Sequence, residues 1–252
     1  MKKILYVVCV VATFFPLNVL ANGIAFINTQ WLWDHRWPHE GKVLKSPPGQ
    51  REYLKEISAY SRWITSNKFD IVGFAEIENK YVLTDISDLL GPDYNYVFVN
   101  GRDGYTGQDV GLVTTKHIKP NTPRTIDVYG QCNGVSKRVS KGLSVVLDNS
   151  FVVLVHLLSR KSANDSARCA QANAIVKHVQ QFQPAGTELI ILGDFNDTND
   201  SEVLKILTTK LKLKNYANPG DWSYIYRNKR DLIDHILVSG DVQRTFKTHT
   251  MK

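Results

Sequence analysis

Two acidic segments lie far apart in the chain, and each follows directly on an apolar run. Glu76 comes after residues 69–74 (FDIVGF), and Asp194 comes after residues 188–192 (ELIIL). Short runs rich in Ile, Val and Phe that end in polar residues are typical of buried strands. A carboxylate at the end of such a strand is held in place and stays within reach of a ligand. Both carboxylates are therefore candidates for a metal or catalytic site.

Two more apolar runs end in residues of useful chemistry. Asn28 follows residues 23–27 (GIAFI), and His156 follows residues 151–155 (FVVLV). Any one of these positions alone is more often an ordinary strand-to-loop transition. Together they supply oxygen ligands for a hard cation and an imidazole that titrates near neutral pH. The combination favours an active site built at strand ends.

The order of these motifs resembles the endonuclease/exonuclease/phosphatase superfamily, which has the DNase I-like fold. The resemblance runs from about residue 23 to about residue 239, and its most specific parts are GDFND at 193–197 and HLLSR at 156–160. A segment carrying Arg168 and Gln171 follows HLLSR, as in the family. Supporting parts are AEIEN at 75–79, GYTGQDVGLVTTK at 104–116 and IDHILVS at 233–239. The resemblance implies an α/β fold, a four-layer α/β/β/α sandwich of two mixed β-sheets, and Mg²⁺-dependent hydrolysis of phosphodiesters.

The metal-binding roles that the resemblance implies fall on Glu76 and Asn28, with Mn²⁺ or Ca²⁺ as alternative ions. Glu78 is a second candidate ligand, because strand alternation places it on the same face as Glu76. Asp194 would activate the attacking water, and Asn196 would either bind the phosphate or position Asp194.

The remaining roles concern the phosphate and the substrate. His156 would contact the phosphate and donate or relay a proton, and Asp234 would orient a partner histidine. Arg160 and Tyr105 would contact the substrate, although Tyr105 fits local packing in a turn equally well. His235 follows Asp234 within a strand, so alternation turns it to the opposite face and predicts a structural role.

One departure from the family concerns the C-terminal end. Members usually carry a Ser-Asp-His motif some tens of residues beyond the segment that corresponds to 233–239. No such motif occurs here, and His249 has no acid before it. We therefore expect this 252-residue chain to lack the family's last C-terminal strand and to have weak or no turnover. An inactive protein that still binds nucleic acid is one alternative.

The first 21 residues predict a signal peptide. Lys2 and Lys3 precede an apolar stretch at 4–15, and Val19 and Ala21 are small residues placed for cleavage after Ala21. A membrane anchor and a buried first strand are the alternatives. Cleavage would leave residues 22–252 as one domain in the periplasm or outside the cell, expected to be a monomer with no stable protein partner.

The charge of the chain favours a polyanionic substrate. The formal net charge is +7, and loss of Lys2 and Lys3 with the signal leaves +5. Such an excess suits nucleic acid, because phosphate contacts supply most non-specific affinity for it. It suits anionic lipid nearly as well, so a phospholipid or sphingomyelin phosphodiesterase, or a phosphatase, is the second alternative.

The number of cysteines bears on whether the chain forms a disulfide. Outside the predicted signal only Cys132 and Cys169 remain, which predicts one disulfide in an exported protein, with two buried thiols as the alternative. Trp31, Trp33 and Trp37 could stack on a base, but packing over the sheet edge is favoured.

The hydrophobic patterns predict helices at 51–67, 162–182 and 200–207, and further strands at 94–100, 110–115, 141–147 and 232–238.

Overall fold

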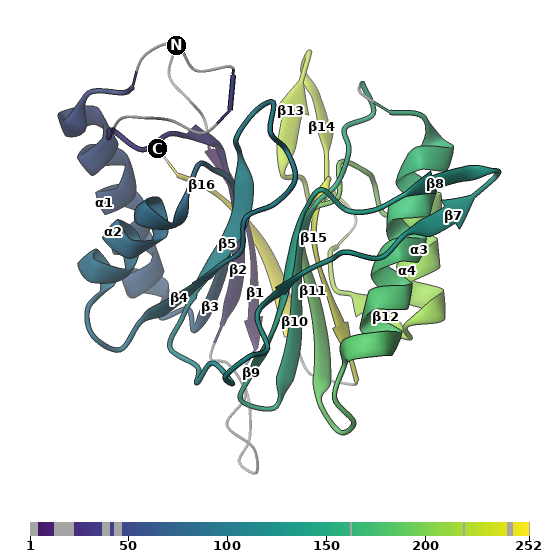
Figure 1. Cartoon of the computed structure of the whole chain (residues 1–252). Coiled ribbons are helices and arrows are strands. Elements are labelled where there is room, and N and C mark those ends of the chain that lie inside the picture. Colours follow the sequence, from purple (N-terminus) through teal and green to yellow (C-terminus); the bar gives the residue numbers. More distant parts are fainter. Residues whose placement is uncertain are drawn as a thin grey trace.

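Two six-stranded sheets pack face to face, and helices cover the outer face of each sheet (Figure 1). The computed structural model describes residues 5–12, 23–36, 41–42, 47–161, 163–218, 220–240 and 244–251. The predicted α/β/β/α sandwich of two mixed sheets is confirmed.

The first sheet has the strand order β16-β1-β2-β3-β5-β4. Its strands are β1 (Leu5–Ala12), β2 (Ile24–Leu32), β3 (Ile71–Ile77), β4 (Asn95–Phe98), β5 (Asp109–Thr114) and β16 (Arg244–Met251). Helices α1 (Gln50–Asn67) and α2 (Lys80–Leu90) cover its outer face. Helix α1 turns Tyr53, Ile57, Tyr60 and Ile64 inward, which is the spacing of one helical face.

The second sheet has the order β12-β15-β11-β10-β9-β6. Its strands are β6 (Arg124–Thr125), β9 (Lys141–Leu147), β10 (Ser150–His156), β11 (Glu188–Asp194), β12 (Leu213–Asn215) and β15 (Asp234–Ser239). Helices α3 (Asp165–Phe182) and α4 (Glu202–Lys210) cover it. Helix α3 begins later than predicted because Asn164 caps it, its side chain accepting the N–H of Ala167 over 2.9 Å.

Two small hairpins project from this framework. The hairpin of β7 (Gly130–Cys132) and β8 (Val135–Lys137) lies against α3, and the Cys132–Cys169 disulfide joins the two, which confirms the predicted bridge. The hairpin of β13 (Tyr224–Tyr226) and β14 (Lys229–Asp231) stands at one end of the sandwich (Figure 1).

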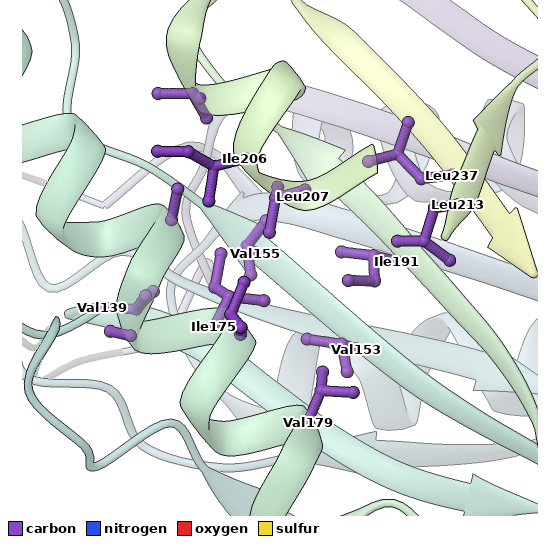
Figure 2. Close-up of a cluster of buried hydrophobic side chains, with 14 of the residues drawn as sticks. Val139, Val153, Val155, Ile175, Val179, Ile191, Ile206, Leu207, Leu213 and Leu237 are labelled. Carbon is purple, nitrogen blue, oxygen red and sulfur yellow. The ribbon is translucent and has the colours of Figure 1, made fainter. Parts of the chain in front are cut away.

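Three apolar layers hold the sandwich together. One lies between the sheets, one between the first sheet and α1 and α2, and one between the second sheet and α3 and α4. Figure 2 shows the third of these, in which Ile191 and Leu237 face Ile175 and Leu207. Burying each such side chain contributes about 1.5–3 kcal/mol, so the layers fix the sheets rigidly.

Strand alternation brings site residues from the second sheet to one edge. Ile190 and Leu192 of β11 face the other sheet, so Asp194, two residues on, faces the same way. The pairing register then sets His156 beside Asp194, and Asp194 beside Asp234. Three strands thus deliver a histidine and two carboxylates to one end of the gap between the sheets.

Three elements differ from the sequence analysis. Helix α2 was not predicted, although Val82, Leu83 and Ile86 form its buried face. Strand β16 follows β15, so residues 232–238 are not the last strand. Residues Leu5–Ala12, which lie within the predicted signal segment, form β1 between β2 and β16 in the uncleaved chain. Among the described residues, no helix combines the length and apolarity needed to cross a bilayer.

Candidate active site

Glu76 reaches the gap between the sheets only because two adjacent strands are irregular. Ile71 and Ala75 of β3 face the second sheet, whereas Phe74 faces the helices, so strict alternation would turn Glu76 toward the helices as well. Instead the register shifts between Ala75 and Ile77, and Glu76 has a φ of 61°. Such a conformation is costly for a residue with a side chain and often marks a functional site.

A second irregularity lies beside it in β2. The pairing of β2 with β3 shifts between Asn28 and Leu32, and Gln30 and Trp31 have φ values of 52° and 72°. The buried hydroxyl of Thr29 lies 3.0 Å from the Ala75 carbonyl and 2.9 Å from the Glu76 carbonyl, so it ties both irregular segments together.

Four predicted residues meet across the two sheets. Asn28 Nδ2 donates to Asp194 Oδ2 over 2.9 Å and lies 3.4 Å from Glu76 Oε1. His156 Nε2 lies 3.8 Å from Asp194 Oδ2 and 3.9 Å from Glu76 Oε1. Asn28 Oδ1 accepts the N–H of Gln30 over 2.9 Å, which turns the amide nitrogen toward the carboxylates. In this arrangement Asn28 bridges the two carboxylates.

Asn196 and Asp234 complete the group. The backbone N–H of Asn196 donates to Asp194 Oδ1 over 2.7 Å, and its side chain donates to the Leu157 carbonyl over 3.0 Å. Of the two roles expected for Asn196, these bonds favour positioning Asp194. Asp234 is buried beside Asp194, and its Oδ1 has no hydrogen-bond partner among the described residues.

Burial governs the electrostatics of this group. Desolvation raises the pKa of Asp194 to about 7, helped by the charge of Glu76 and opposed by the Asn196 and Asn28 hydrogen bonds. Burial and then the charge of Asp194 raise the pKa of Asp234 well above its ordinary value. Burial and then Lys141 lower the pKa of His156 to about 3, so its imidazole is neutral at pH 7.

The donor set fits a hard divalent cation. The carboxylates of Glu76 and Asp194, joined by Asn28, are oxygen donors of the kind that Mg²⁺ takes in ones and twos while keeping several waters. Within the described residues no group of three or more His, Cys, Asp or Glu side chains is placed to hold a metal ion by itself. A cation here would also favour the charged form of carboxylates whose pKa values are raised by burial and by one another.

A cavity of about 880 Å³ opens above the carboxylates. The predicted residues Asn28, Glu76, His156, Arg160, Asp194, Asn196 and Asp234 all line it. Arg160 is fixed there by a 2.6 Å hydrogen bond to Asp197, a residue that also pairs with Arg168 over 2.9 Å. Trp31 lines the cavity too, with 37% of its surface exposed, whereas Trp37 falls outside the described residues.

Tyr105 and Glu78 do not lie where the sequence predicted them. Tyr105 is 68% exposed in the 101–108 loop and does not line the cavity. Glu78 is fully buried and accepts the N–H of Asp34 over 2.8 Å, outside the cavity. It does not share a face with Glu76, because the register shift breaks the alternation on which that expectation rested. His235 is turned away as expected, toward the Asp197 carbonyl at 2.8 Å.

Three residues that support the site were not among those predicted for it from the sequence. Thr29 holds the Glu76 segment through its hydroxyl. Lys141 of β9 lies opposite His156 of β10 in the strand register. Ser223 Oγ accepts the N–H of Asp234 over 3.1 Å. The hairpin of β13 and β14 also lines the cavity through Tyr224 and Tyr226.

Comparison with known proteins gives one family. A model described as the Endonuclease/Exonuclease/phosphatase family matches residues 43–248. No curated protein matches the sequence significantly.

Solved structures with this fold are distant in sequence. The human Nocturnin catalytic domain with bound sulfate is 18% identical, with a TM-score of 0.54 and 84% of each chain covered. The mannosyl-6-phosphatase Bt3783 of Bacteroides thetaiotaomicron is 17% identical, with a TM-score of 0.51 over 86% of this chain and 84% of that one. Beta toxin of Staphylococcus aureus with bound magnesium ions is 15% identical, with a TM-score of 0.50 over 75% and 78%. At these identities the likeness is one of fold.

Proposed function

The chain belongs to the endonuclease/exonuclease/phosphatase family, and we propose that it is a Mg²⁺-dependent phosphodiesterase whose substrate is nucleic acid. Members of the family hydrolyse phosphate esters and typically depend on a divalent metal. The observation that carries the proposal is the meeting of Glu76, Asn28, Asp194 and His156 at the floor of a cavity with basic residues on its rim.

The metal would be held by Glu76, with Asn28 and Asp194 next to it. When bound, the cation neutralises charge on the phosphate and on the leaving oxygen. Asn28 keeps the two carboxylates a fixed distance apart through hydrogen bonds of 2.9 Å and 3.4 Å. This geometry is set before the substrate arrives, because the strand irregularities and Thr29 hold it.

Asp194 is the proposed general base. Asn196 holds one of its oxygens through a 2.7 Å bond, and the other faces Asn28 and His156. Burial raises the pKa of this carboxyl when no metal is bound, and a nearby cation would lower it, so that Asp194 is the ionised base when the metal is bound. Asp194 would take the proton of the attacking water.

His156 is the proposed phosphate contact. Its pKa of about 3 makes it a neutral hydrogen-bond donor at pH 7. Its Nδ1 has no partner among the described residues. A neutral imidazole suits the donation of a hydrogen bond to a phosphate oxygen, and it leaves the positive charge to Arg160 and Lys161 on the rim.

A polyanion fits this cavity better than a small ester does. The cavity of about 880 Å³ is open, and two basic side chains, Arg160 and Lys161, line it together with the carboxylates. Phosphates on either side of the scissile one would reach these side chains, which is the usual way that proteins gain affinity for nucleic acid.

Hydrolysis assays with matched substrates test the proposal. We expect weak cleavage of DNA or RNA with Mg²⁺, because the family's Ser-Asp-His motif is absent, no cleavage in EDTA, and loss of the remaining activity in Asp194→Asn. Asp88→Asn, which changes an exposed carboxylate on α2, serves as the control and should keep activity. Faster turnover of sphingomyelin or of a phosphomonoester would assign the alternative substrates. Binding of nucleic acid without any cleavage would show a binding protein instead.

We also propose that the protein is exported and loses residues 1–21. The signal-like composition of that segment and the Cys132–Cys169 disulfide support this, because disulfides persist in oxidising compartments. Cleavage would remove β1 from its place between β2 and β16. The proposal therefore requires that residues 22–252 fold without that strand.

A further inference from the structure

The β13–β14 hairpin presents two aromatic rings to the cavity. Its turn is formed by Arg227 and Asn228, with φ values of 47° and 64°, which suits a tight two-residue hairpin. Alternation along β13 then puts Tyr224 and Tyr226 on the same face, and both line the cavity. Their rings are parallel to within 8°, with centroids 6.4 Å apart.

The hairpin is anchored to the catalytic floor. Ser223 Oγ accepts the N–H groups of Ile233 and Asp234, each over 3.1 Å. The backbone N–H of Ser223 donates to the Asp231 carbonyl over 3.0 Å, which closes the base of the hairpin. The two tyrosines therefore have a fixed position relative to Asp234.

Two positive charges lie over the ring of Tyr226. Lys161 Nζ is 4.5 Å from the centroid of the Tyr226 ring, and the Arg227 guanidinium is 5.2 Å from it. Lys161 comes from the loop after His156 and also lines the cavity. An aromatic ring and the ammonium group that lies over it therefore belong to the same cavity lining as Glu76 and Asp194.

Another aromatic residue lines the cavity from the first sheet. Trp31 lines the cavity from the irregular part of β2 and is 37% exposed. Tyr226 is 43% exposed. Partly exposed aromatic side chains at a cavity mouth are suited to stacking against a flat ligand.

Aromatic rings together with cationic side chains suit the base and the phosphate of a nucleotide. A base stacks on an aromatic ring, and a neighbouring lysine or arginine pairs with the phosphate, as in proteins that bind single strands. Bases inside a duplex are already stacked on each other and offer only their edges to a protein. A stacking surface therefore favours unpaired nucleotides.

A lipid surface fits the hairpin less well. An element that inserts into a bilayer interface presents apolar side chains at its leading end. The tip of this hairpin is Arg227-Asn228, followed by Lys229 and Arg230, all exposed. Charged and amide groups at the tip suit a polyanion in water.

We propose that the β13–β14 hairpin, with Lys161 and Trp31, is a stacking site for unpaired bases that selects single-stranded nucleic acid over duplex. This inference rests on the proposed function, since it identifies the form of nucleic acid that reaches the Glu76–Asp194 site.

Binding without cleavage tests the inference. Fluorescence anisotropy of a labelled 12-nucleotide strand and of its duplex would be measured in EDTA, which prevents hydrolysis. We expect the wild type to bind the single strand more tightly. Tyr226→Ala and Tyr224→Ala should each weaken single-strand binding by about 5- to 150-fold, which corresponds to about 1–3 kcal/mol for one stacked base. Duplex binding should change by less than about twofold.

Matched variants separate stacking from folding. Tyr226→Phe keeps the ring and should keep binding. Tyr129→Ala removes another tyrosine that is 53% exposed and has an arginine, Arg138, 5.3 Å from its ring centroid, but lies outside the cavity lining. It should leave the affinity unchanged. Equal melting temperatures for all variants would exclude loss of fold as the cause of weaker binding.

The outcomes distinguish this inference from the proposed function. Equal loss of single-strand and duplex binding in Tyr226→Ala, or no loss in either, would overturn the stacking site. So would Tyr226-dependent binding to sphingomyelin vesicles. Hydrolysis of bis(p-nitrophenyl) phosphate with Mg²⁺ reports on the catalytic proposal separately, because this small diester does not need the hairpin. Activity on it, combined with unaltered strand binding in Tyr226→Ala, would refute the hairpin inference alone.

Discussion

Asn28 donates a hydrogen bond of 2.9 Å to Asp194, and this bond joins the two sheets at the floor of the cavity. Asn28 belongs to β2 and Asp194 to β11, 166 residues apart in the chain. Since the same amide lies 3.4 Å from Glu76, one side chain sets the spacing of the two carboxylates. The site therefore depends on how the sheets pack on each other.

Replacement of the two carboxylates should separate metal binding from chemistry. Glu76→Gln should weaken Mg²⁺ binding and lower the rate together. Asp194→Asn should lower the rate by about 10²- to 10⁴-fold, the usual contribution of a positioned base, while metal binding is largely kept. Calorimetric titration with Mn²⁺ and steady-state kinetics would measure the two effects. Full Mg²⁺-dependent activity in both variants would show that the site lies elsewhere.

The hydroxyl of Thr29 should position Glu76. Thr29→Val keeps the shape but leaves the Ala75 and Glu76 carbonyls without this buried donor, which should cost about 1–3 kcal/mol of stability. Metal affinity and kcat should fall as well, because the irregular segment that aims Glu76 is no longer tied. Thr29→Ser should restore both. If Thr29→Val lowers only the melting temperature, the hydroxyl is structural and does not act on the site.

The buried His178 should make the protein less stable in mild acid. Its Nε2 is 2.8 Å from Ser144 Oγ, and burial, then Arg124, lower its pKa from 6.5 to about 4. The unfolded chain therefore binds a proton between about pH 6.5 and pH 4 that the folded chain does not. The stability that His178 contributes is complete above pH 6.5 and is lost as the pH falls toward 4.

The contribution of His178 has to be measured as a difference between wild type and variant. Asp194, with its raised pKa, increases the stability as the pH falls over nearly the same pH range, and this opposes the loss caused by His178. Urea unfolding at several pH values would compare the wild type with His178→Gln. The free energy of unfolding of the wild type should fall more steeply between pH 6.5 and pH 4 than that of the variant. Parallel curves would contradict the lowered pKa.

The disulfide should contribute strongly to stability. Cys132 and Cys169 are 37 residues apart, and closing a loop of that size stabilises by about 4 kcal/mol in the chain-entropy model. The double variant Cys132→Ala, Cys169→Ala should unfold at correspondingly lower urea concentration. Thiol titration of the denatured, unreduced protein without residues 1–21 should find no free thiol, and two free thiols would disprove the bridge.

Export should leave a mature chain that begins at Asn22. N-terminal sequencing of protein recovered from the periplasm or the medium would identify the first residue. Residues 22–252, expressed alone, should fold and melt cooperatively without β1. Recovery of an intact chain that starts at Met1, with the shortened form unable to fold, would show instead that β1 is a permanent strand of the first sheet.

Local sequence patterns were enough to predict the fold class and several of the residues that line the cavity. Glu76, His156 and Asp194 each follow an apolar run, and the facing of Asp194, Asp234 and His235 follows from simple alternation within a strand. These are local properties, so a pattern of a few residues is enough to predict them. The pairing of Cys132 with Cys169 was predictable because the proposed mature chain offers no other partner.

The direction in which these side chains point depends on contacts between strands that are far apart in the sequence. Glu76 faces the cavity and Glu78 does not, because a register shift in β3 is held by a hydroxyl from β2. The placement of Tyr226 on the cavity and of Tyr105 outside it likewise depends on loops from distant parts of the chain. Irregular backbone of this kind is stabilised by contacts between strands, and no local sequence pattern encodes those contacts.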